Sequence, residues 1–124
     1  MIKEFEINPY PRKLWISVGE DFDIIKSKFH FNDSQDKDFT QQIIETDYDG
    51  IVFDVTKDDY KGYLVFLINS DDSVLVHEAS HVVLSIYADC GMVLDPDMDQ
   101  EPFCYLVEYI FNLLKKTTKE LTTE

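Results

Sequence analysis

The 124-residue sequence has no apolar stretch of membrane-spanning length, and its first residues do not have the pattern of a secretory leader. A spanning helix needs about 20 consecutive apolar residues. The N-terminal residues Met1–Phe5 lack both the basic start and the apolar run of a signal peptide. The sequence has only two cysteines, Cys90 and Cys104, and their spacing fits no cysteine metal motif. We therefore expect a cytoplasmic protein whose thiols are reduced.

Basic residues are also scarce. The chain has 11 Lys and Arg against 25 Asp and Glu, so its net charge is -14. Repulsion disfavours nucleic acid and anionic membranes as partners, whereas basic substrates or basic proteins are attracted. The sequence has no internal repeat and no low-complexity tract, and 44% of its residues are hydrophobic. This composition predicts one folded domain over residues 1–124.

The first seventy residues predict a twisted, mainly antiparallel sheet. Alternating apolar and polar residues, or short apolar runs, are typical of strands. A Pro-containing turn joins the first two strands into a hairpin, and Phe22, Ile25 and Phe29 have the spacing of a helix that opens near Asp21. Polar turn-forming residues at 56–62 predict a turn, and the polar segment 31–42, which has no regular pattern, predicts a loop. The predicted strands are Ile2–Ile7, Leu14–Val18, Gln42–Glu45, Ile51–Val55 and Tyr63–Ile68.

The pattern His-Glu-x-x-His at residues 77–81 carries the clearest chemistry in the chain. It lies in a segment that predicts a helix ending at Gly91. Residues four apart share one helix face, about 6 Å apart along the axis, so His77 and His81 can reach one metal ion. Glu78 then lies beside a water on that ion and can act as a general base.

A second helix is expected to begin near Gln100, with Pro102 tolerated in its first turn. Glu101, in that turn, is the predicted third ligand, and Glu108 is the alternative, because it lies seven residues later on nearly the same face. Tyr105 and Tyr109 share this side and are candidates for hydrogen bonding to a ligand or to the substrate. Residues 117–124 are expected to fray. The apolar stripe of this helix is Phe103, Leu106, Val107, Ile110, Phe111 and Leu114.

His77-Glu78-Ala79-Ser80-His81, followed by Glu101 twenty residues after the second histidine, resembles the gluzincin branch of the zinc metallopeptidases. The continuation at residues 99–106 resembles small zincin-like proteins encoded by bacteriophages and integrated elements. The resemblance covers about the last fifty residues. It implies Zn²⁺ held by His77, His81 and Glu101, with Glu78 as base and proton shuttle. It also implies a minimal zincin-like α+β fold, in which a sheet precedes the two helices.

The leading hypothesis is thus a small intracellular zinc-dependent metallopeptidase that acts on peptide or protein substrates, with Glu78 and Tyr105 as its catalytic candidates. Its principal rival is a non-catalytic zinc-binding protein with an acidic interaction surface. A third hypothesis is an acidic mimic of nucleic acid, which predicts that both motif histidines are dispensable for binding its partner. The oligomeric state is not predicted by any of these patterns.

Overall fold

The computed structural model describes residues 1–32 and 48–122, and the chain divides into two compact units. We call Met1–Asn69 the sheet unit and Ser70–Glu124 the helical unit. The predicted strand Gln42–Glu45 lies outside the described residues, as does most of the predicted loop at residues 31–42. The single domain expected over residues 1–124 stays a prediction.

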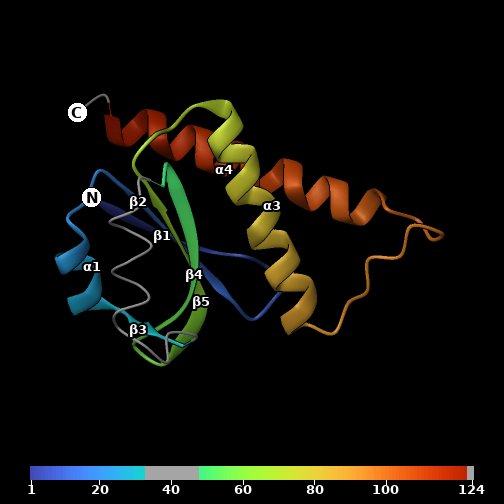
Figure 1. Ribbon diagram of the computed structural model, residues 1–124. Coiled ribbons are helices and arrows are strands. Elements are labelled where there is room, and N and C mark those ends of the chain that lie inside the picture. The colour runs from blue at the N-terminus through green and yellow to red at the C-terminus, as the bar shows by residue number, and fades with distance from the viewer. Residues whose placement is uncertain (33–47, 123–124) are drawn as a thin grey trace. The chain divides into compact units, whose positions relative to one another are not determined.

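The sheet unit contains a five-stranded mixed sheet with the order β1-β2-β5-β4-β3 (Figure 1). Three of its neighbouring pairs are antiparallel, but the central pair, β2 and β5, is parallel. The predicted α+β class is therefore confirmed. The sheet is mixed, because β5 lies in its middle and runs parallel to its neighbour β2. The strands are β1 (Ile2–Glu6), β2 (Lys13–Val18), β3 (His30–Phe31), β4 (Gly50–Lys57) and β5 (Tyr60–Leu67).

The turn between β4 and β5 is shorter than the sequence suggested. The predicted turn at residues 56–62 is wrong in extent, because Lys57 already pairs with Tyr60. Only Asp58 and Asp59 form the turn, with φ of 52° and 67°. Two consecutive left-handed residues define the hairpin turn that matches strand twist, and Asp tolerates this conformation better than most residues.

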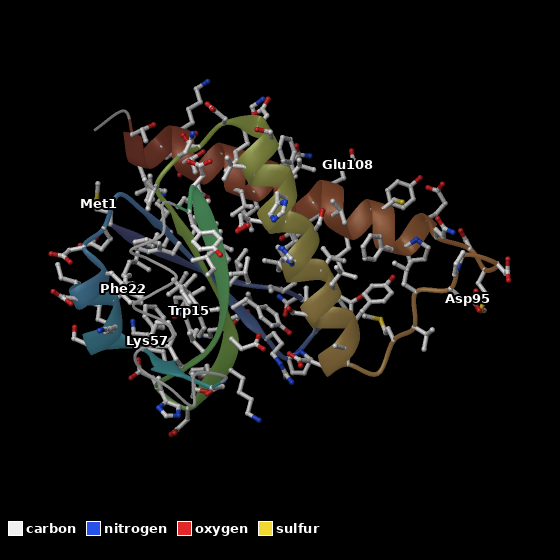
Figure 2. The ribbon with its side chains drawn as sticks, viewed as in Figure 1. Met1, Trp15, Phe22, Lys57, Asp95 and Glu108 are labelled. Atoms are coloured by element: carbon white, nitrogen blue, oxygen red, sulfur yellow. The ribbon has the colours of Figure 1, made fainter. Side chains whose placement is uncertain are left out.

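Helix α1 (Phe22–Lys28) lies on one face of the sheet (Figure 1) and begins where the Asp21 side chain accepts a hydrogen bond from Asp23 N–H. Trp15 and Phe22 lie between this helix and the strands (Figure 2). Trp15 is 1% exposed, and its indole N–H donates to Glu4 Oε1 over 2.8 Å. The buried cluster of this face comprises Trp15, Ile25, Phe29, Val55, Leu64 and Phe66.

Gly62 on β5 allows the two central strands to approach. A Cβ added there would lie 2.0 Å from the Lys13 carbonyl oxygen and 2.8 Å from the Trp15 ring. Both distances are below any that real Cβ atoms show. A side chain at this position therefore conflicts with the pairing of β2 and β5.

The helical unit consists of α3 (Asp72–Asp89) and α4 (Glu101–Thr122), which run in opposite senses and pack against each other (Figure 1). Lys115 Nζ lies 3.3 Å from Asp72 Oδ2 near the start of α3. Near its end, the ring centroids of Tyr87 and Phe103 are 5.4 Å apart. The predicted end of α3 is confirmed, because Gly91 has a φ of 69° and Met92 N–H donates to the Tyr87 carbonyl over 2.9 Å.

The expected fraying after residue 116 is wrong, because α4 continues to Thr122. Thr117 and Thr118 are buried there. The Thr118 hydroxyl donates to the Lys115 carbonyl over 3.0 Å, and the Thr122 hydroxyl donates to the Thr118 carbonyl over 2.7 Å. Threonine hydroxyls can therefore be buried on this helix at low cost, since its own carbonyls accept from them. No helix in the described ranges is long and apolar enough to cross a membrane.

Candidate metal centre

The buried face of α3 determines where its histidines point. Ala79, Val82, Val83 and Ile86 are fully buried and recur at helical spacing. His77 and His81 are each two residues from Ala79, which places them roughly 160–200° around the helix from it. Both therefore lie on the exposed face, and the side chain of His77 is 69% exposed. The prediction that they share one face is confirmed.

The two imidazoles are close enough to hold one ion. His77 Nε2 and His81 Nε2 are 3.2 Å apart, and the ring planes are inclined at 72°. A tetrahedral zinc with Zn–N bonds of about 2.0–2.1 Å holds two nitrogens roughly 3.3 Å apart. The observed separation is close to that value. It also fits a hydrogen bond between two neutral rings, one donating and the other accepting.

Glu78 is a buried carboxylate beside this pair. The residue is 3% exposed, and its Oε1 lies 3.8 Å from His77 Nε2. Its Oε2 is buried and has no hydrogen-bond partner among the described residues. Burial raises the pKa of the Glu78 carboxyl, and the nearby His77 lowers that pKa in part. A buried oxygen without a partner costs free energy of folding, so its presence favours a role in binding or catalysis.

His77, Glu78 and His81 offer ligand atoms that all lie within 4.8 Å of one another. Within residues 1–32 and 48–122, they form the only group of three or more His, Cys, Asp or Glu residues suited to a metal ion. The donor set fits Zn²⁺, because two imidazole nitrogens and a carboxylate oxygen are all zinc ligands. By geometry, Glu78 could be either a ligand or the base beside one.

Glu101 lies in the first turn of α4, is exposed, and is outside this group. The start of α4 lies near Tyr87, which is six residues, or about 9 Å of helix, beyond His81. Glu101 is also roughly 180° around α4 from the buried Ile110. The structure therefore does not bring Glu101 to the histidines, and its role as third ligand stays a prediction.

Glu108, the alternative ligand, is exposed on α4 (Figure 2) and also lies outside the group. It is two residues from Ile110, so it projects from nearly the same exposed side as Glu101. Tyr105 and Tyr109 are 65% and 51% exposed on the same helix. Nothing in the described structure places either hydroxyl at the histidine pair, so the catalytic role of Tyr105 stays a prediction.

One neighbour of the site was not identified from sequence. Leu84 lies on α3 and is 46% exposed, although it is apolar. It lies three residues after His81 and seven after His77, so it continues their outward stripe along α3. The signal was the seven-residue spacing from His77, which marks one helix face. Leu84 offers an apolar surface next to the candidate metal ligands.

No family model, curated protein or solved structure matches this chain. The likeness to gluzincins therefore rests on the residues of the motif and on the spacing to Glu101.

Proposed function

We propose that the protein is a small zinc-dependent peptidase. One observation supports this above all: His77 Nε2 and His81 Nε2 lie 3.2 Å apart, and the buried carboxyl of Glu78 places its Oε1 3.8 Å from His77 Nε2 while its Oε2 has no partner in the described structure. A pair of surface histidines needs no buried carboxylate next to it. A hydrolytic site does, because it requires a group that accepts and returns a proton.

In this proposal His77 and His81 hold the zinc. Glu101, with Glu108 as its alternative, stays the third ligand that the resemblance implies, although neither lies with the histidines in this structure. When bound, the ion supplies a Lewis acid and makes water more acidic. Glu78 accepts a proton from the attacking water and returns it to the leaving amine nitrogen. Its raised pKa favours this role, since a carboxyl that ionises nearer neutral pH both takes and gives a proton readily. Tyr105 is the candidate for donating a hydrogen bond to the substrate.

The charges of the helical unit favour basic peptides. Between residues 71 and 108 the sequence has no Lys or Arg. The three lysines of the helical unit, Lys115, Lys116 and Lys119, follow at the other end of α4. Such a one-signed field raises the local concentration of cationic ligands. Leu84 adds an apolar contact beside the histidines. The carboxylates of this segment are Asp71, Asp72, Glu78, Asp89, Asp95, Asp97, Asp99, Glu101 and Glu108.

Metal content and hydrolysis test the proposal together. The protein is purified without chelator or affinity metal, its zinc is measured by mass spectrometry, and matched basic and acidic peptide libraries are assayed. We expect one zinc per chain and faster cleavage of basic peptides. His81→Ala should lose the zinc, whereas His30→Ala, the matched control on β3, should keep it. Glu78→Gln should keep zinc but lose hydrolysis, and full activity in that variant would refute the proposed role of Glu78.

The second candidate is a zinc-binding protein without catalysis. The exposure of the histidine pair favours it, because an ion held there on the surface has coordination positions that a basic partner protein can fill. The two candidates differ in one result. Stoichiometric zinc without cleavage of any peptide in either library would support the binding protein and reject the peptidase.

A further inference from the structure

The sheet unit contains a cavity of about 390 Å³ at one end of its sheet. The loop between β1 and β2 and the turn between β4 and β5 frame it. Backbone hydrogen bonds hold the loop: Ile7 N–H donates to the Arg12 carbonyl over 3.2 Å, and Tyr10 N–H donates to the Ile7 carbonyl over 2.8 Å. The Asp58–Asp59 turn fixes the other side. The cavity is thus largely preformed and has the size of a small-molecule site.

Cations gather at this cavity although the protein is strongly acidic. Arg12, Lys13 and Lys61 line it, and the first two are half-buried. Lys13 Nζ is held in place, because it lies 3.0 Å from Glu4 Oε2 and 3.9 Å from the centroid of the Tyr60 ring. Three of the eleven basic residues of the chain therefore share one small cavity.

Glu6 and Asp59 also line the cavity, so both signs of charge are present. A simple anion would meet these two carboxylates, and a simple cation would meet three basic groups. A ligand that carries one charge of each sign finds a partner for both. The rings of Tyr10 and Tyr60, together with Pro11, offer apolar surface for the body of such a ligand.

We propose that this cavity binds a free α-amino acid with an aromatic or other apolar side chain. Its carboxylate and ammonium pair with the basic and acidic groups of the wall, and its side chain lies against the tyrosine rings. This inference is independent of zinc and of hydrolysis, because every lining residue belongs to the sheet unit.

The test is an NMR titration of the full-length, metal-free protein with L-phenylalanine at physiological salt. We expect shifts of the backbone amides that line the cavity. N-acetyl-L-phenylalanine lacks the ammonium, L-phenylalaninamide lacks the carboxylate and L-alanine lacks the ring. Each should bind about tenfold more weakly, since each loses one of the three contacts.

Two exposed lining residues provide variants that do not threaten folding, Lys61→Gln and Glu6→Gln. Both variants should bind L-phenylalanine about tenfold more weakly than wild type. Lys28→Gln, on α1 and outside the cavity lining, should leave the affinity for L-phenylalanine unchanged. The proposal is overturned if about 10 mM L-phenylalanine causes no shift at the lining residues. It is equally overturned if the N-acetyl compound binds as tightly as the amino acid, because the cavity would then be a simple anion site.

Discussion

Replacing Glu78 by Gln should make the metal-free protein more stable at neutral pH. The substitution keeps the shape of the side chain and removes its charge. In the folded protein this carboxyl is 3% exposed, its Oε2 has no partner among the described residues, and burial raises its pKa. A buried, ionised carboxylate stabilises a fold only when both of its oxygens have partners, so the ionised form of Glu78 destabilises the metal-free protein.

The size of the effect and its pH dependence follow from the same burial. Gln leaves a buried amide in the same place, so the gain comes only from removing the buried charge; since one pKa unit corresponds to about 1.4 kcal/mol, Glu78→Gln should raise the free energy of unfolding by about that order at pH 8. The carboxyl has a folded-state pKa above its ordinary value of 4.5, so the folded protein binds more protons than the unfolded chain between those two values. Wild-type stability therefore falls as pH rises through this window. At pH 4 both states are largely protonated, and the difference between the variants should shrink to about 0.5 kcal/mol or less.

Urea unfolding followed by circular dichroism, at pH 4 and pH 8 with chelator present, measures both quantities. Glu6→Gln is the matched control, because it makes the same change at an exposed position and should be nearly neutral at both pH values. A Glu78→Gln protein that is less stable than wild type at pH 8 would refute the reasoning. That result would mean that the ionised carboxylate is satisfied in the fold.

Three further outcomes are expected. Gly62→Ala should lower the free energy of unfolding by about 3 kcal/mol, because the new Cβ meets the Lys13 carbonyl and the Trp15 ring, and urea unfolding will show whether the site is as tight as described. Glu4→Gln should cost about 0.5 kcal/mol at pH 7 and nothing well below the folded-state pKa. The hydrogen bonds from Lys13 and Trp15 lower the pKa of Glu4, and that stabilisation is lost as the carboxylate protonates; a pH series of unfolding curves measures it. Added zinc at a hundredfold excess over its dissociation constant should raise wild-type stability by about 2.7 kcal/mol but leave His81→Ala unchanged, which thermal melts with and without metal will test.

Local patterns predicted much of this fold. Alternation placed β1, the Pro-containing turn and β2, and the positive φ of Gly91 ends α3 where the sequence indicated. The pairing of β2 with β5 was not predicted, because the chain between two strands far apart carries no local signal for their contact. The burial of Thr118 was also missed, because its hydroxyl donates to the Lys115 carbonyl of the same helix, so a residue that is polar in the sequence can be buried at low cost.

The candidate metal centre was only partly readable from sequence. Helical spacing is a short-range rule, so it placed His77 and His81 on one face and Glu78 beside them. The relation of Glu101 to these residues depends on how far α4 is displaced along α3, which packing between the helices decides. Within the described residues Oε2 of Glu78 has no partner, which likewise follows from tertiary packing, and no motif encodes it.

The parallel pair at the centre of the sheet also bears on how the sheet unit folds. Each of the two hairpins, β1–β2 and β4–β5, closes a short loop, but Lys13 must find Gly62 across the whole intervening chain. Loop-closure entropy opposes that encounter until enough apolar surface is buried to offset it. We expect the two hairpins to form early and their docking to limit the folding rate. During synthesis the backbone N–H and C=O groups of β2 that pair with β5 then remain without their partners until β5 has left the ribosome.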